Sequence, residues 1–319
     1  MPSAAASAAA GRWQNRPYFP RADWYWRKIP ASPALHASSA SIAAALATGT
    51  HSIALANFAT NLVHASEITG STPRYDILFR NQTGNGGEDW SPVDPFGTDT
   101  IPIPDGTETG IPPGDFGLTD GHIAVADARR GMCYNLWQAT ASGTPNRIRG
   151  ATWGARTNLW GDGRETDGNS STGARLARFG GPIRQSEIAA GRIDHALFFG
   201  TDMATVGNPS TPSSWVYPAA GSDGQNQGAS ATTIKEGTRV QLDPAANLSG
   251  VTGAQLTIAR ALQQYGAYCG DNGGARMGFI MEYIPGGSAV YTSAGLSEYM
   301  NMTQIPWASL RVLNNWDGS

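Results

Sequence analysis

Two histidines stand beside aspartates in segments that read as strands. His122 lies two residues after Asp120 in GLTDGHIAVAD, and His195 directly follows Asp194 in RIDHALFFG. A carboxylate that holds an imidazole in one orientation and adjusts its pKa is the usual setting of a general base, although a histidine that only orients a loop looks the same in sequence. We expect both histidines to come from separate strands to one polar pocket beside Asp120 or Asp271.

Two kinds of sugar chemistry fit the residue types around these histidines. A polysaccharide lyase abstracts a proton next to a carboxylate while fixed donors hold the developing enolate. A glycoside hydrolase instead needs two carboxyl groups that face each other across the sugar. The candidates for catalysis are His122, His195, Asp120, Asp271 and Tyr265, and the candidates for substrate binding are Trp137, Trp153, Asn135, Asn272, Arg239 and Tyr268.

Several of these candidates have a structural alternative. The DNGG segment that starts at Asp271 is typical of a turn, because Asp and Asn bond their own backbone and Gly accepts positive φ. His195 shares one face of an expected strand with Leu197 and Phe199, which is typical of a core histidine. Exposed indole rings can also hold a glycan without cutting it. The residues therefore leave open an enzyme and a binding module.

The element that would position His122 is a β-hairpin over residues 122–137. With a two-residue period and a glycine-containing turn, this segment places alanines and His122 on one face. If Ala126 lies opposite Cys133, the same register places His122 opposite Trp137. The small alanines would then leave a shallow trough beside the histidine and the indole.

Composition predicts a mainly β protein, with an antiparallel, jelly-roll-like β-sandwich, long loops and a few short helices. The 319 residues include 40 glycines and 20 prolines, which are costly in helix interiors. Helices are predicted near 39–48 and 253–266, the second opened by a capping box of Thr252 and Gln255. A single turn is predicted at 186–191, with Ser186 as its N-cap. Short alternating runs elsewhere predict strands.

One folded, glycan-interacting domain is expected over 12–319, after a flexible Ala/Ser-rich tether at 1–11. Such a tether cannot bury enough surface to fold alone, and it lacks the basic start and apolar core of a signal peptide. The Gly- and Pro-rich stretch 81–119 is predicted to be a long loop, of a kind that is either functional or disordered.

Charge and motifs exclude several classes. The net charge of −3 and a pI near 5.9 argue against nucleic acid binding. No apolar run approaches the roughly 20 residues of a membrane helix, so membrane insertion is not expected. Zinc, phosphate-loop, dinucleotide and GxSxG motifs are absent, and no cofactor is expected beyond the weak Ca²⁺ candidate at 161–169. Cys133 and Cys269 lack a CxxC spacing and are expected to be buried thiols.

A set of segments in fixed order resembles a largely uncharacterised family of secreted or surface proteins that are common in actinobacteria. These segments are TDGHIAVAD, YNLWQA, SEIAAGRIDHALFF, GTRVQLDP, TIARALQQYGAYCGDNGG and IPWASLRVL. The resemblance covers nearly the whole chain and implies one domain, and some members occur beside carbohydrate-active modules. The positions that match the family pattern are Asp120, His122, Asp127, His195, Tyr265, Tyr268, Asp271 and Asn272.

We therefore expect a surface-exposed domain that recognises a bacterial cell-envelope polysaccharide and, in the enzymatic alternative, cleaves it. Family members carry an export signal that is not evident here, which favours a virion-surface role as a phage minor tail or receptor-binding protein. The alternatives are a secreted bacterial polysaccharide lyase or glycoside hydrolase, and a non-catalytic structural virion protein. Other tail proteins or further copies of this chain would be the protein partners.

Overall fold

The computed structural model describes residues 18–79, 95–107, 120–139, 148–166, 169–206, 214–224, 230–284, 289–315 and 318. The tether at 1–11 and most of the predicted loop 81–119 lie outside these residues, as does Asp167 of the Ca²⁺ candidate segment. Strands account for 29 % of the protein and helices for 17 %, so the mainly β expectation is confirmed.

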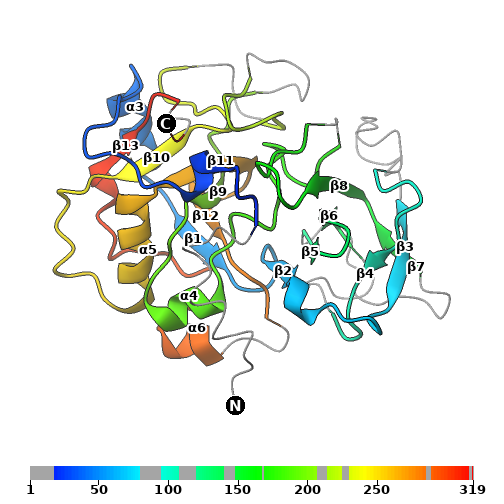
Figure 1. Ribbon diagram of the computed structural model, residues 1–319. Helices are drawn as coiled ribbons and strands as arrows, with labels where there is room; N and C mark the ends of the chain where they lie inside the picture. The colour runs from blue at the N-terminus through cyan, green and yellow to red at the C-terminus, as the bar shows by residue number, and fades with distance from the viewer. Residues whose placement is uncertain are drawn as a thin grey trace.

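The largest element is a six-stranded mixed sheet in the left half of Figure 1. In spatial order its strands are β1 (His51–Ala54), β12 (Met277–Ile280), β9 (Leu197–Thr201), β11 (Ala267–Asn272), β10 (Arg239–Leu242) and β13 (Leu310–Val312). The β1–β12 and β9–β11 pairs are parallel, and the other three pairs are antiparallel.

Helices pack on one face of this sheet. They are α3 (Ser39–Leu46), α4 (Gln185–Ala190), α5 (Gly253–Gln264) and α6 (Ala289–Ser293). Leu197 and Phe199 of β9 share a buried apolar cluster with Ile258 and Leu262 of α5, because alternate strand residues point to the same face. The two longer predicted helices are thus confirmed.

Two cap predictions were wrong. Thr252 is the N-cap of α5, but its hydroxyl and its backbone N–H both donate to Gln304 Oε1, and Gln255 Oε1 accepts from the Gln304 N–H. A distant glutamine therefore replaces the local capping box. The N-cap of α4 is Arg184, so Ser186 lies inside that helix.

The opposite face of the large sheet meets an aromatic segment and a second sheet. The aromatic segment is α2 (Asp23–Trp26), in which Trp24 stacks on Phe198 with ring centroids 6.1 Å apart. The second sheet has the order β2 (Thr60–Val63), β5 (His122–Asp127), β6 (Met132–Trp137) and β8 (Trp153–Asn158). Ala124 and Ala126 of β5 join this shared core, and their small size lets the two sheets approach.

The predicted hairpin register is confirmed, with Ala124 opposite Asn135 and Ala126 opposite Cys133. Asp127 closes the turn by accepting the backbone N–H groups of Arg129 and Arg130. Both cysteines are buried and free.

The other face of β5 packs on a third sheet. Its strands are β4 (Ile101–Pro102), β3 (Arg74–Phe79) and β7 (Ile148–Ala151) in that order, and two single-turn 3₁₀ helices, η2 (Ala65–Glu67) and η3 (Trp307–Ser309), complete the named elements. Ile123 and Val125 supply the apolar contacts with this sheet.

The sheets are mixed, whereas the sequence predicted antiparallel pairing. Four strand pairs are parallel, namely β1–β12, β9–β11, β2–β5 and β3–β7. Residue alternation identifies a strand but not the direction of its neighbour, and the long connections of this chain permit parallel crossovers. In the described part of the chain, no helix is long and apolar enough to cross a membrane.

Candidate functional site

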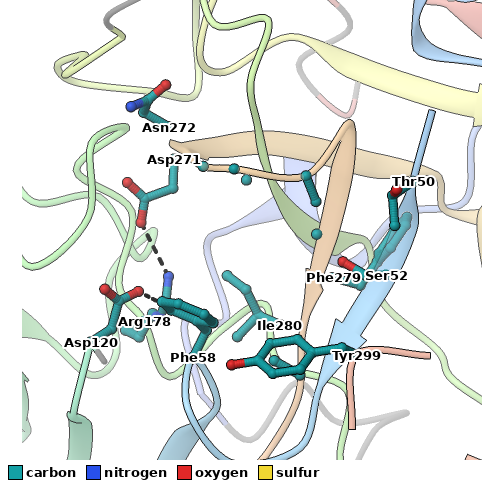
Figure 2. A pocket seen from close by; sticks show the side chains of 16 residues that line it. Thr50, Ser52, Phe58, Asp120, Arg178, Asp271, Asn272, Phe279, Ile280 and Tyr299 are labelled. Atoms are coloured by element: carbon teal, nitrogen blue, oxygen red, sulfur yellow. Dashed lines mark hydrogen bonds and ion pairs between the residues drawn. The ribbon is translucent and has the colours of Figure 1, made fainter. Parts of the chain in front are cut away.

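A pocket of about 520 Å³ lies beside the strand ends of the large sheet, where β11 leads into β12. Figure 2 shows Asp120, Arg178 and Asp271 gathered at one end of this pocket, while Thr50 and Ser52 lie at the other. The volume is in the range of small-molecule sites. We call this the acidic pocket.

Arg178 connects the two sheets beneath the acidic pocket. Its buried guanidinium donates through Nε to Thr60 Oγ1 at 3.0 Å and through Nη1 to Asp271 Oδ2 at 3.4 Å. Its Nη2 lies 4.0 Å from Asp120 Oδ2. Because Thr60 belongs to β2 and Asp271 to β11, one side chain ties both sheets to the carboxylates.

Asp120 is held in its ionised form. Burial alone would raise the pKa of this carboxyl group, but His122 and Arg178 outweigh burial, and the pKa is lowered. The Trp137 indole also hydrogen-bonds the carboxylate and lowers its pKa further. Asp120 thus offers the pocket a stable negative charge.

Asp271 has the opposite tendency. Burial raises its pKa well above the usual range, and the neighbouring charge of Asp223 raises it further, against the opposing effect of Arg178. The Gly173 N–H donates to Asp271 Oδ1 at 3.2 Å. Asp271 therefore retains a proton to a higher pH than an ordinary aspartate.

Two more carboxyl groups lie behind Asp271. Glu236 is fully buried beside Asp223, and burial is the main cause that raises the pKa of both groups. The Asn272 N–H donates to Asp223 Oδ1 at 3.3 Å. A Cβ at Gly173 would overlap the Asp223 carboxylate, so this position requires glycine.

His122 stands behind Asp120 and does not line the pocket. Its Nε2 lies 3.6 Å from Asp120 Oδ2, which is longer than a normal hydrogen bond. Burial and the charge of Arg178 lower the pKa of His122 to about 4, although Asp120 opposes this shift. The ring is therefore neutral near pH 7 and positions the carboxylate.

The two tryptophans that were predicted to bind sugar lie next to each other on neighbouring strands of the second sheet. Trp137 and Trp153 are opposite each other on β6 and β8 and stack with centroids 4.8 Å apart. Asn135 is fully buried and donates to Glu165 Oε1 at 3.1 Å. Asn135 therefore stabilises the hairpin from its buried side.

His195 lies elsewhere, and the expected meeting of the two histidines is not observed. Its Nε2 is 2.9 Å from Glu187 Oε1 and 3.0 Å from Arg184 Nη1, and its ring stacks on Tyr25 at 4.9 Å. Strand β9 begins only at Leu197, so the alternation that predicted the direction of His195 does not reach it. His195 is therefore a buried residue that stabilises the core.

Three further candidates also hold the fold together. The buried Arg239 donates to the carbonyl oxygens of Tyr265 at 2.6 Å and Trp24 at 2.9 Å. Tyr268 donates to the same Trp24 carbonyl at 2.8 Å, and the Tyr265 hydroxyl lies 3.5 Å from Asp194 Oδ1. These side chains anchor the aromatic α2 segment to the large sheet.

Among the predicted site residues, Asp120, Asp271 and Asn272 line the acidic pocket. Sequence reasoning missed Arg178, which lies in a loop without a distinguishing motif, and two aromatic residues at the mouth. Phe58 and Tyr299 line the pocket with 43 % and 49 % exposure and ring centroids 6.3 Å apart. Their unusual exposure is a structural signal that the sequence does not carry.

Comparison of the chain with family models, with curated proteins and with solved structures gives no match. The family resemblance stays a prediction.

Proposed function

We propose that the acidic pocket binds a bacterial cell-envelope glycan and hydrolyses one of its glycosidic bonds. One observation carries this proposal: Asp120 and Asp271 flank Arg178 at one end of the pocket, and their pKa values are shifted in opposite directions. Two carboxyl groups with separated pKa values can supply the acid and the base or nucleophile that glycoside hydrolysis uses.

The roles follow from the two protonation states. Asp271, which keeps its proton, would donate it to the oxygen of the leaving sugar as the bond between that oxygen and C1 breaks. Asp120, which is ionised, would either take a proton from the attacking water or bond to C1 until water displaces it. Asp223 helps Asp271 to keep its proton, and His122 and Arg178 lower the pKa of Asp120.

Hydrolysis fits the pocket better than the lyase alternative. A lyase must neutralise the carboxylate of a uronic acid with a cation that is free to bind it. In the described lining of the pocket, Arg178 is the one cation, and it is buried against two aspartates. An acidic sugar would thus meet a site without an available positive charge.

A second candidate function is glycan binding without cleavage, which the exposed rings of Phe58 and Tyr299 favour. For either function we propose deployment outside the cell or on a virion surface, as a minor tail or receptor-binding protein. For the fold we propose a sandwich of packed sheets, supported by the core that the large sheet shares with β5 and β6, whereas the four parallel strand pairs do not fit the antiparallel order of a jelly roll.

The test is cleavage of envelope polysaccharide by the protein and by Asp120→Asn and Asp271→Asn variants. Loss of a general acid or base typically slows a reaction about 10²- to 10⁴-fold, so we expect new reducing ends from the native protein and at least a hundredfold less from either variant. Asp99→Asn is the control, because Asp99 lies outside the pocket and pairs with Arg130 and Arg156. Binding of polysaccharide without new reducing ends would favour the binding module instead.

A further inference from the structure

One transverse row of the large sheet has almost no side chains. Ser52 of β1 is opposite Gly278 of β12, Gly278 is opposite Gly200 of β9, and Gly200 is opposite Asp271 of β11. All four residues line the acidic pocket. Four neighbouring strands thus form a floor that is bare in its centre and ends at the proposed acid.

The bare floor is confined to the pocket. The adjoining row, which contains Ile53, Phe279 and Phe199, faces the helices and is filled with buried side chains. On the same face as the floor, Phe198 and Ile280 fill the core between the two sheets. Bulky residues thus fill the opposite face and border the bare row on its own face, where Ile280 also lines the pocket.

Neither backbone conformation nor packing explains the two central glycines. Both lack the positive φ that favours glycine, and an added Cβ would meet its nearest atom at 3.5 Å at Gly200 and 3.6 Å at Gly278, which is ordinary contact. Glycine inside a strand is costly, and its usual reasons include a bulge, a bend or the close approach of a ligand. The register of β9 and β11 shifts between Cys269 and Asp271, and Gly200 is the partner of Asp271, so this irregularity gives Gly200 a structural reason. Gly278 lies on β12, one strand away from the shift, and therefore carries most of the inference.

The size and charge of the pocket indicate the ligand. Adjacent strands are about 4.8 Å apart, so the two glycines leave roughly 10 Å of open backbone between Ser52 and Asp271. Phe58 and Tyr299 offer aromatic surface to the same pocket. Without a free cation in the described lining, an uncharged ligand is favoured over an acidic one.

We propose that the Ser52–Gly278–Gly200–Asp271 row is a subsite that holds an uncharged sugar ring flat against the sheet, with its glycosidic bond at Asp271. The placement of the bond rests on the proposed function, whereas the binding of the ring does not. The two glycines then act as specificity residues, because they admit the ring to the sheet surface.

The test measures binding by variants that fill the floor. Gly278→Ala and Gly278→Val add one and three carbon atoms there, and Gly200→Ala is a second variant at the neighbouring position. Gly250→Ala is the matched control, because its Cβ would meet nothing within 4 Å and Gly250 does not line the pocket. The ligands are oligosaccharides released from bacterial envelopes by mild acid and divided by anion exchange into a neutral and an acidic pool.

We expect the native protein and Gly250→Ala to bind the neutral pool equally in calorimetric titrations. Overpacking of a fitted site typically costs enough to weaken binding about ten- to a hundredfold, which we expect for Gly278→Ala and Gly200→Ala, with still weaker binding for Gly278→Val. The alanine variants should melt no lower than the native protein, because glycine is unfavourable in a strand. Unchanged binding by all three floor variants, preference for the acidic pool, or binding of neither pool would overturn the subsite.

The same variants and oligosaccharide pools distinguish the sugar subsite from the proposed hydrolysis. Binding of the neutral pool that depends on Gly278 but yields no reducing ends would sustain the subsite and refute hydrolysis. Cleavage that Gly278→Val leaves unchanged would sustain hydrolysis and refute the subsite.

Discussion

Replacement of Arg178 by methionine tests the electrostatic account of the acidic pocket. Methionine keeps an unbranched apolar side chain of similar length but removes the guanidinium from Thr60, Asp120 and Asp271. Removing one partner from a buried ion pair leaves the other charge without compensation, at a cost of about 3–5 kcal/mol. The ionic contact with Asp120 is long, at 4.0 Å, the 3.4 Å contact is with Asp271, whose raised pKa favours the protonated form, and both carboxyl groups have some solvent access. We therefore expect the lower end, a loss of about 3 kcal/mol in the free energy of unfolding at pH 7.

The loss should depend on pH with a definite sign. The native fold lowers the pKa of Asp120, so this group stabilises the fold above the ordinary pKa of a carboxyl group, and that contribution disappears as pH falls through the folded pKa. Without Arg178 the pKa of Asp120 should rise, and a protonated Asp120 no longer needs the cation. The difference in stability between the native protein and Arg178→Met should therefore be largest near neutrality and shrink toward pH 4.

Urea unfolding at several pH values between 4 and 7.5 measures both quantities. Arg192→Met is the control for the same exchange at an exposed pair, since Arg192 is 62 % exposed and its contact with Asp194 should contribute no more than about 1 kcal/mol. Addition of Asp120→Asn to Arg178→Met should recover part of the loss. A loss no larger than that of Arg192→Met, or a difference that grows in acid, would refute the reasoning.

Two further predictions concern the histidines. Burial lowers the pKa of His122 to about 4, so the unfolded chain takes up a proton before the folded protein does as pH falls below about 6.5, and this group should cost roughly 3 kcal/mol of stability between pH 7 and pH 4. His122→Asn should therefore flatten the dependence of unfolding free energy on pH in this range, measured by urea unfolding. An unchanged dependence would count against a neutral His122. His195→Ala should lose about 3 kcal/mol, because it leaves Glu187 buried without its imidazole partner. The folded His195→Ala variant should nevertheless bind glycan as tightly as the native protein does. A selective loss of binding in calorimetry would instead show that His195 belongs to the glycan-binding site.

The sequence predicted those features that depend on local pattern. The alternation around the Asp127 turn was sufficient to predict the register of Ala126 with Cys133, because a slip of one residue would have moved the alanines to the wrong face. The helices near Ile42 and Leu262 followed from apolar spacing, although the capping box predicted for the second helix is not formed.

The composition of the pocket could not be predicted in the same way. Asp120, two residues before β5, and Asp271 of β11 both contact Arg178 because their sheets pack on each other. A single sequence does not show which sheets pack together. The DNGG pattern favours a turn, yet Asp271 and Asn272 are the last residues of strand β11, and the chain turns only after them. Arg178 was missed because its role depends on three partners that are distant along the chain, Thr60, Asp120 and Asp271.

The parallel pairing of β1 with β12 has a consequence for how the molecule is made. It joins residue 52 to residue 278, so β1 cannot pair until β12 has been synthesised and has left the ribosome. Contacts so distant along the chain raise the contact order and slow folding, because a long loop has to close before the contact stabilises it. The apolar β1 residues Ile53 and Ala54 are therefore exposed during most of synthesis, and a chain that stops short of residue 277 cannot complete this edge of the sheet. Nascent or truncated chains should consequently depend on chaperones to a degree that the finished protein does not.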